Sequence, residues 1–98
     1  MIHHSVVFKL RYIKGSSEEK VFLQEVEKLR TINGVKKFQC LRQISQKNNF
    51  DYGIFMQFDT IEMYEAYNQH PMHLAFVQDF WTHYVDDFLE LDFESPSS

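Results

Sequence analysis

The sequence has few of the features that mark secreted, nucleic-acid-binding or membrane-spanning proteins. A single cysteine, Cys40, cannot form a disulfide within the chain. Acidic residues outnumber basic residues by 14 to 10, and no basic run is longer than Lys36-Lys37, so nucleic acid is not an expected partner. No apolar run approaches the roughly 20 residues needed to cross a bilayer, and Met1 leads straight into strand-like sequence without a basic, apolar leader. We therefore expect a cytoplasmic protein that binds neither nucleic acid nor membrane.

What is present is enough for one globular domain. A chain of 98 residues can bury about two thirds of the surface that it exposes when unfolded, and 16% of its residues are aromatic, a high content for this length. A second domain has no room. We expect a single domain over residues 1–94 and a disordered tail over residues 95–98.

The first third of the chain predicts a strand followed by a helix. Residues 2 to 12 alternate between apolar and polar side chains, as in a half-buried strand. Ser16 and Glu19 have the spacing of a capping box, which starts a helix near residue 17, and Asn33-Gly34 ends it. The residues expected to face the core are Ile2, His4, Val6, Phe8, Leu10 and Tyr12 in the strand, and Phe22, Val26, Leu29 and Ile32 in the helix.

The middle of the chain predicts a β-hairpin. Residues 35–45 favour a strand, although apolar side chains occur on both of its faces and its inward face is ambiguous. A polar turn over residues 46–49 joins it to a second strand, in which Phe55 points away from the core. The inward residues of this second strand are Tyr52, Ile54, Met56 and Phe58.

The last third predicts a broken helix and a final strand. Asp59 or Thr60 caps a helix that runs to a break before Pro71, and a second helix follows the break. The buried stripe of this second helix is expected to contain Leu74, Val77, Trp81 and Tyr84, with Phe76 and Phe80 widening it. In the final strand, Glu90 and Asp92 alternate with apolar residues, which are Leu89, Leu91 and Phe93.

The element order is β-α-β-β-α-β, the ferredoxin-like arrangement of the α+β class, in which a four-stranded antiparallel sheet carries two helices on one face. The other face stays uncovered, and we expect Val7, Phe55 and Phe88 to lie on it. An apolar face that meets water indicates a partner. The economical partner is a second copy, because a two-fold dimer buries the same surface twice. We therefore expect a homodimer that forms through the sheet face.

The junction between the two later helices carries the candidate chemistry. Pro71 fits the first position of a helix, so His70 is its expected N-cap residue. His73 falls in the first turn, where unpaired N–H groups and the positive end of the helix dipole disfavour an added proton. A neutral imidazole can accept a proton, and the hydroxyl of Tyr67 could reach the same place from the preceding helix.

Several stretches spread over nearly the whole chain point to one family. The most specific is His70-Pro71-Met72-His73. The others are Ile2-His3-His4-Ser5-Val6-Val7-Phe8-Lys9-Leu10, Asp51-Tyr52-Gly53 followed by Phe58, Tyr67 with Phe76, and Asp92-Phe93. Together they resemble the stress-responsive α/β barrel family, called Dabb, in which His-Pro-x-His lies at this place between helices. The resemblance implies a dimeric α+β barrel.

The resemblance implies roles for individual residues, but it does not imply one activity. Plant members that act as polyketide cyclases use a histidine and a tyrosine in a cavity between sheet and helices. Carried over to this chain, the pattern implies His73 as the base, Tyr67 as its phenolic partner and His4 as a residue of the pocket lining. No signature fixes a substrate, and bulky phenylalanine and methionine side chains could fill the cavity.

Three classes of function stay open. An enzyme of the cyclase or isomerase kind would need no cofactor, because His73 would remove an acidic proton beside a carbonyl and Tyr67 would donate to the oxygen. In a binding protein, His73 and Tyr67 would only orient a small organic molecule. The further ligand-binding residues expected are His4, His70 and Trp81. In a structural protein, side chains would fill the pocket, and the same residues would only pack and cap. Monooxygenases with the same barrel shape are a fourth alternative, which only the shared shape supports.

No metal site is predicted. His70 and His73 have the spacing of residues on one helix face, but two histidines without a nearby carboxylate make a poor ligand set. Among the open classes, we favour a homodimer that binds a small organic molecule in an apolar pocket, with its reaction unassigned.

Overall fold

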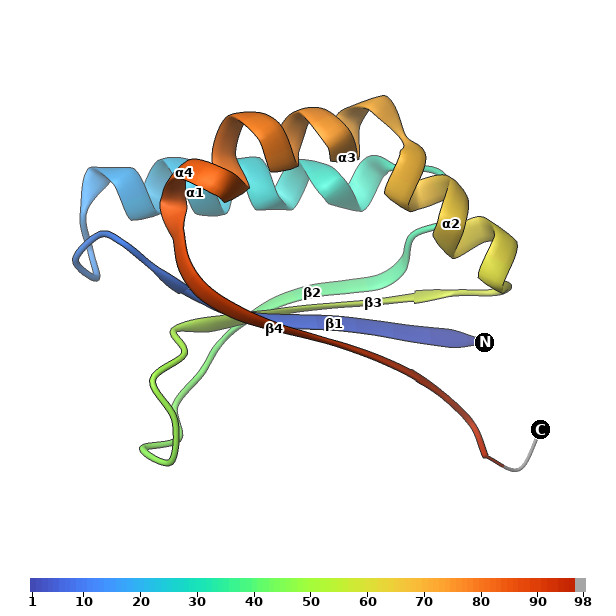
Figure 1. Ribbon diagram of the computed structural model, residues 1–98, viewed down its shortest axis with the longest axis horizontal. Helices are drawn as coiled ribbons and strands as arrows, with labels where there is room; N and C mark the ends of the chain where they lie inside the picture. Colours follow the sequence, from blue (N-terminus) through green and yellow to red (C-terminus); the bar gives the residue numbers. More distant parts are fainter. Residues whose placement is uncertain (97–98) are drawn as a thin grey trace.

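The protein, as a computed structural model, is described over residues 1–96 and consists of a four-stranded sheet with helices on one face (Figure 1). The strands are β1 (Ile2–Leu10), β2 (Lys36–Arg42), β3 (Tyr52–Phe58) and β4 (Val85–Glu94). The helices are α1 (Ser17–Lys28), the 3₁₀ helix η1 (Leu29–Thr31), α2 (Ile61–Gln69), α3 (Pro71–Phe76), the π-helix η2 (Val77–Trp81) and α4 (Thr82–Tyr84). The tail expected over residues 95–98 falls partly on residues 97 and 98, which lie outside the described residues.

The strand order is β2-β3-β1-β4, and all neighbouring strands are antiparallel. This is the predicted ferredoxin-like α+β arrangement. The first and last strands of the chain are neighbours, so His4 on β1 lies opposite Met56 on β3 and opposite Asp92 on β4. Residues from the two ends of the chain can therefore contribute to one site.

The core lies between the sheet and the helices, as the alternation in β1 predicts. His4, Val6, Phe8 and Leu10 are buried, while β1 ends at Leu10 and does not extend to residue 12. The expected stripe of the first helix is also buried, and it consists of Phe22, Val26, Leu29 and Ile32. Burial of each such apolar side chain stabilises the fold by about 1.5–3 kcal/mol. This packing holds the sheet in a fixed position against the helices.

The predicted helix starts are confirmed. The hydroxyl oxygen of Ser16 accepts from the backbone N–H of Glu19 at 3.2 Å, and that of Thr60 accepts from the N–H of Met63 at 3.2 Å. These bonds satisfy N–H groups that have no partner within the helix. Gly34, which follows η1, has a φ of 91°, a conformation that glycine adopts without steric cost. Within residues 1–96, no helix combines the length and apolar character of a membrane span.

The ambiguous strand β2 turns Phe38 and Cys40 towards the core and leaves Leu41 exposed on the other face. Its pairing with β3 shifts register between Lys36 and Gln39, and the residue at this irregularity, Lys37, has a φ of 51°. An inserted residue reverses which side chains face inward. The alternation of residues 35–45 is ambiguous for this reason.

The buried stripe of the second helix differs from the prediction at Leu74. Leu74 is 50% exposed, whereas Phe76 is buried and contacts Trp81 with ring centroids 6.2 Å apart. These two residues are five positions apart, which is the step of a π turn, and η2 is a π-helix at this point. A π turn has more residues per turn than an α-helix, so a strict three- and four-residue spacing does not continue through this segment. Tyr84 and Val77 pack against the core as expected.

The prediction that Phe88 lies on the uncovered sheet face is wrong. Phe88 pairs with the buried Phe8 across β1 and β4, and its ring lies 5.5 Å from that of Trp81, on the helix-covered side. The reason is that β4 begins at Val85, which is buried, and the register shifts between Lys9 and Leu10. Apolar residues occur in both sets of the alternation in β4, so the alternation of this strand does not say which set faces inward.

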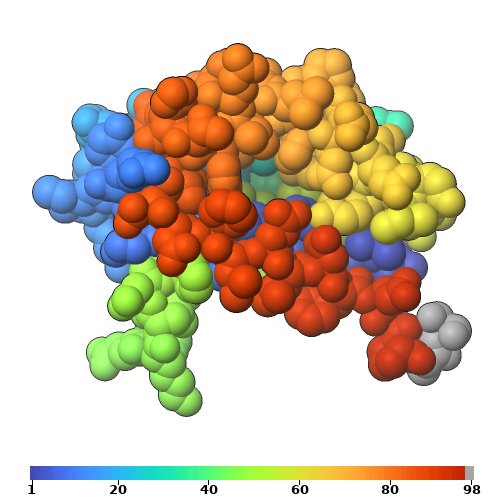
Figure 2. Space-filling view, in the orientation of Figure 1, coloured from blue at the N-terminus to red at the C-terminus, as the bar shows by residue number. Residues whose placement is uncertain are grey.

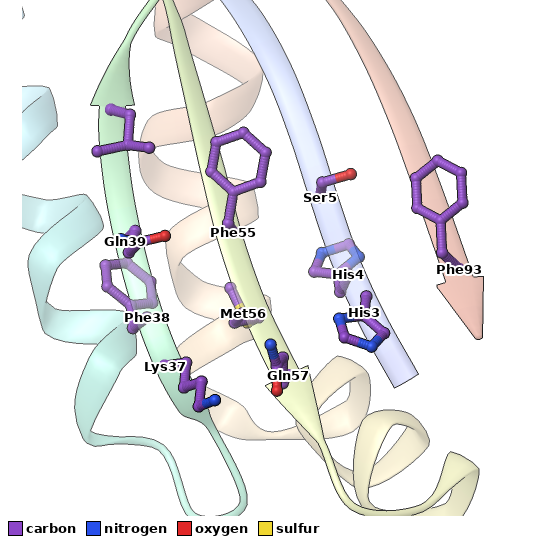
Figure 3. Close-up of a pocket in the computed structure, with 11 residues that line it drawn as sticks. His3, His4, Ser5, Lys37, Phe38, Gln39, Phe55, Met56, Gln57 and Phe93 are labelled. Atoms are coloured by element: carbon purple, nitrogen blue, oxygen red, sulfur yellow. The ribbon is translucent and has the colours of Figure 1, made fainter. Parts of the chain in front are cut away.

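The uncovered face is consequently more apolar than predicted. Its exposed apolar residues are Leu41, Leu89, Leu91 and Phe93, and Val7 and Phe55 lie beside them, with Val7 opposite Leu89 and Ser5 opposite Leu91. Gly53 has no Cβ, and this leaves room for the Phe55 ring. A Cβ at position 53 would lie 2.8 Å from atoms of that ring. Figure 3 views this face with the helices behind the sheet, and it shows Phe55, Phe93 and His3 around a shallow hollow of about 730 Å³.

Candidate active site

A second cavity, of about 400 Å³, lies between the sheet and the helical segments α2, α3 and η2. Figure 2 shows the surface hollowed between the last strand, in red, and the orange helical segment. The apolar lining residues are Val6, Leu29, Ile54, Met56, Phe76, Val77, Trp81 and Phe88, and the polar ones are His4, Tyr67, Asn68, His73, Thr82 and Glu90. Four of the predicted site residues, His4, Tyr67, His73 and Trp81, therefore border one cavity.

His4 is oriented by a carboxylate on the neighbouring strand. Its Nδ1 lies 2.6 Å from Asp92 Oδ1 and 3.0 Å from the hydroxyl oxygen of Tyr64. Since an ionised carboxylate can only accept, we assign the proton of the neutral ring to Nδ1, which leaves Nε2 as an acceptor. The ring is 6% exposed, so packing holds it in this orientation.

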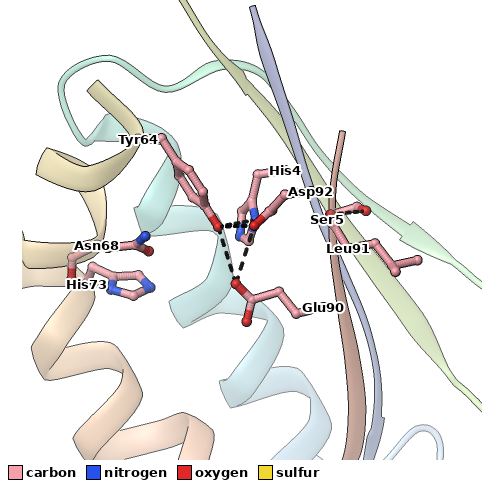
Figure 4. A network of polar contacts seen from close by, with 8 residues as sticks. All are labelled: His4, Ser5, Tyr64, Asn68, His73, Glu90, Leu91 and Asp92. Atoms are coloured by element: carbon pink, nitrogen blue, oxygen red, sulfur yellow. Dashed lines mark hydrogen bonds and ion pairs between the residues drawn. The ribbon is translucent and has the colours of Figure 1, made fainter. Parts of the chain in front are cut away.

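Tyr64 connects the two carboxylates of β4 (Figure 4). Its hydroxyl donates to Asp92 Oδ2 at 2.8 Å, and Glu90 Oε1 lies 3.3 Å away. Burial raises the pKa of Tyr64, and the hydrogen bond to Asp92 raises it further, so the phenol keeps its proton at neutral pH. Tyr64 therefore donates a hydrogen bond to Asp92 at neutral pH and holds this carboxylate behind His4.

His73 is oriented in the same way as His4, except that its acceptor is a backbone carbonyl. Its Nδ1 donates to the carbonyl oxygen of Asn68 at 3.1 Å, which leaves Nε2 as the acceptor. Burial lowers the pKa of His73, the bond to Asn68 opposes this shift, and the nearby His4 adds to it. The direction agrees with the prediction of a neutral ring, although burial, and not the helix dipole, is the largest cause.

Tyr67 lies between the two imidazoles. Its ring centroid is 4.5 Å from that of His73 and 6.2 Å from that of His4. Burial raises the pKa of Tyr67, and the charge of Glu90 raises it further, so the hydroxyl stays protonated at neutral pH. It can serve as a hydrogen-bond donor to an oxygen that gains negative charge.

Three polar atoms of these residues are free to meet a ligand. Within residues 1–96, Glu19 Oε2 is the one fully buried side-chain nitrogen or oxygen that lacks a hydrogen-bond partner. The Tyr67 hydroxyl and the Nε2 atoms of His4 and His73 make no hydrogen bond within that part of the chain either, so they are not sealed in the core. All three residues line the cavity.

His70 has a different place from the other predicted residues. Its Nδ1 accepts from the backbone N–H of Met72 at 3.1 Å, which confirms His70 as the N-cap of the helix that Pro71 starts. It is not among the residues that line the cavity. The two histidines of the junction are thus separated in role, one capping α3 and the other facing the cavity.

Candidate metal ligands occur at the same end of the cavity. Suitable atoms of His4, Glu90 and Asp92 lie within 4.8 Å of one another. A metal at His4 Nδ1 would have to replace the proton that this atom shares with Asp92. The hydrogen bonds among His4, Tyr64 and Asp92 already account for the positions of these side chains.

Four residues of the site are not predicted from the sequence, namely Tyr64, Asn68, Glu90 and Asp92. The sequence shows Glu90 and Asp92 only as members of an alternation, with Asp92 also part of the family resemblance. A signal was present, because charged residues on the inward positions of a strand need a buried polar partner, and His4 offers one. It could not be used until the strand pairing placed β4 beside β1.

These features define a ferredoxin-like α+β protein with a histidine-lined cavity between its sheet and its helices. Residues 2–95 match the family described as Stress responsive A/B Barrel Domain, Dabb, and the chain belongs to this family. No curated protein sequence matches the chain.

Solved structures agree with this assignment. A Dabb family protein from Mesorhizobium loti with a ferredoxin-like fold is 45% identical, with a TM-score of 0.94 over 96% of this chain and 95% of that chain. Two distant structures share the fold alone. One is a dimeric ferredoxin-like protein of unknown function from Thermobifida fusca, at 19% identity and a TM-score of 0.79 over 96% of this chain and 90% of that one. The other is a hydroxynitrile lyase from Passiflora edulis, at 11% identity and a TM-score of 0.84 over 99% and 94%.

Proposed function

We propose that the cavity binds a small organic molecule and that Tyr67 and His73, with His4, transfer a proton on it without a cofactor. The observation that supports this proposal is that free atoms of these three residues border one cavity of about 400 Å³. The opposite nitrogen of each imidazole is held, by Asp92 in one case and by the Asn68 carbonyl in the other. Two oriented acceptors and one donor are the parts that acid–base catalysis needs.

In the proposed reaction, His73 is the base. Its lowered pKa keeps the ring neutral at pH 7, so that Nε2 can take an acidic proton next to a carbonyl. Tyr67 keeps its proton and donates a hydrogen bond to the carbonyl oxygen as that oxygen gains charge. His4 Nε2 accepts a hydrogen bond from a hydroxyl of the ligand and orients it. Positioned proton transfer of this kind accelerates reactions by about 10²–10⁴-fold.

The apolar wall supports a ligand with a flat, apolar body. Phe76, Trp81 and Phe88 follow one another along the wall, with ring centroids 6.2 Å and 5.5 Å apart. Aromatic surfaces of this kind bind by burial of apolar area and stacking.

Binding without turnover is the second candidate function. A cavity of about 400 Å³ lies within the usual range of small-molecule sites, which favours a binding role over a structural one with a filled pocket. The fold does not choose between an enzyme and a binding protein, because one fold hosts many activities. The difference lies in whether His73 accepts a proton from the bound molecule.

Paired variants of His73 test this proposal after a screen for ligands and turnover. Gln at this position keeps a polar side chain but cannot act as the base, whereas Ala loses both properties. We expect equal loss of turnover in His73→Ala and His73→Gln, with ligand binding and melting temperature close to those of the wild type. Full activity in His73→Gln would reduce the residue to an orienting group and would favour binding alone. His83→Gln, an exposed residue of α4, is the matched control.

We further propose that two copies pair through the uncovered sheet face. Val7, Phe55 and Leu89 lie on this face together with further exposed apolar residues. The dimeric description of the Thermobifida fusca protein supports dimerisation for this fold. A sheet-to-sheet pair would leave the cavity free, because the cavity lies on the helix-covered side.

A further inference from the structure

We infer that the cavity selects an organic cation, namely an alkylamine attached to an apolar or aromatic body. This inference rests on the proposed function, because it assigns the class of molecule that the same cavity takes. It is carried by the charge of the cavity's polar end and by the aromatic residues that face it.

The polar end of the cavity has a net negative charge. Glu90 on β4 lines the cavity. Asp92, also on β4, lies directly behind His4. No lysine or arginine is among the residues that line this cavity within residues 1–96. Within residues 1–96, His4 is the basic residue in ion-pair range of both carboxylates, with Nδ1 2.6 Å from Asp92 and 3.9 Å from Glu90, while burial lowers the pKa of the nearby His73. A protonated His4 would neutralise one carboxylate at most, so the charge stays negative in either state of the ring.

Glu90 has acceptor capacity to spare. The single proton of the Tyr64 hydroxyl is directed to Asp92 at 2.8 Å, and Glu90 Oε1 is the more distant neighbour at 3.3 Å. Its side chain is 48% exposed, and its one ion-pair contact within the described chain is the distant His4. An ammonium group carries up to three N–H donors and a positive charge, so it can satisfy both the free oxygen atoms and the charge.

The aromatic wall suits the same kind of ligand. The rings of Trp81 and Phe88 are 5.5 Å apart at an interplanar angle of 73°, and both residues line the cavity together with Glu90. A cation near aromatic faces gains a cation–π interaction, while the body of the ligand gains apolar contact. A carboxylate in the same position would meet the repulsion of Glu90. A neutral alcohol would gain neither charge interaction.

Three probes of similar shape test the inference, namely phenethylamine, phenethyl alcohol and phenylpropionate. Their affinities are measured by NMR titration at pH 7 with the wild type, with Glu90→Gln and with the control Glu65→Gln, which removes an exposed charge of α2. The expected result is that the amine binds on the order of tenfold more tightly than the alcohol, with phenylpropionate weakest. Glu90→Gln should abolish this preference, and Glu65→Gln should retain it.

The outcomes separate this inference from the proposed function. If the three probes bind equally, or if the preference for the amine survives Glu90→Gln, the selection of a cation is wrong while the cavity remains a ligand site. If none of them shifts the signals of Trp81 and His73, the proposed function fails as well. Should Glu90→Gln not fold, added salt on the wild type gives the second measurement. Salt must weaken binding of the amine and leave that of the alcohol unchanged, and a binding of the amine that is insensitive to salt would overturn the inference.

Discussion

His4 on the first strand and Asp92 on the last strand form a hydrogen bond of 2.6 Å across 88 positions of sequence. The bond joins the two ends of the chain at one end of the cavity, because β1 and β4 are neighbours in the sheet. Asp92 also accepts from the Tyr64 hydroxyl at 2.8 Å, so one carboxylate orients two residues. The geometry of the site therefore depends on the pairing of β1 with β4.

Asp92→Asn should test this dependence. The amide has nearly the same shape but no charge, and hydrogen bonds to charged groups are the stronger ones. We expect the free energy of unfolding to fall by about 1 kcal/mol, a modest loss because Asp92 is partly exposed. Urea unfolding measures the loss, and ring ¹⁵N NMR reports whether His4 keeps its proton on Nδ1. Asp86→Asn removes a contact of 3.9 Å between exposed partners and should change stability little; an equal loss in both variants would contradict the role of Asp92.

The lowered pKa of His73 predicts a pH dependence of stability. The folded state binds this proton less readily than the unfolded state, whose histidine pKa is about 6.5. The stability that comes from the neutral ring is therefore fully present above about pH 6.5 and decreases as the pH falls through the window down to the folded pKa. NMR titration should give a pKa below 6.5, and urea unfolding of His73→Gln should vary less with pH in that window. A raised pKa would contradict this account.

Much of the fold was predictable because local patterns agree with the tertiary structure. The alternation of His4, Val6 and Phe8 predicts which side of β1 is buried, and Ser16 and Thr60 mark the starts of two helices. Apolar spacing, capping and topology each depend on near neighbours in sequence or on general rules of chain connection. Such features can be inferred without coordinates.

The parts that failed depend on register. The apolar spacing predicts Leu74 in the core, but Leu74 is 50% exposed, and the π-helix η2 that follows interrupts this spacing. Alternation predicts Phe88 on the wrong face of the sheet, because the start of β4 and the register shift at Lys9 decide which side chains point inward. His73 lines the cavity, and its role as the base, which the His-Pro-x-His resemblance implies, stays a prediction. The acidic partners Glu90 and Asp92 required the strand pairing, which local sequence does not contain.

The proposed dimer predicts a result of mass measurement. Light scattering at micromolar concentration should give twice the mass of the chain. Leu89→Asp and Val7→Asp should each yield a monomer or prevent folding, because a charge would be buried without a partner at the interface. Ile44→Asp is the control, since Ile44 is 88% exposed and lies outside the strands. A monomeric wild type, or a dimer that persists in Leu89→Asp, would contradict pairing through this face.

His70 gives the last prediction, which separates its capping role from ligand binding. Its Nδ1 accepts from the N–H of Met72 at 3.1 Å, so His70→Ala should lower the free energy of unfolding by about 1 kcal/mol. His70→Asp should restore most of this loss, because its carboxylate is a good cap and favours a helix N-terminus. Urea unfolding measures both variants, and NMR titration with a cavity probe measures binding. If capping is its whole role, His70→Asp binds the probe as the wild type does. Weaker binding at unchanged stability would instead give His70 a direct part in holding the ligand.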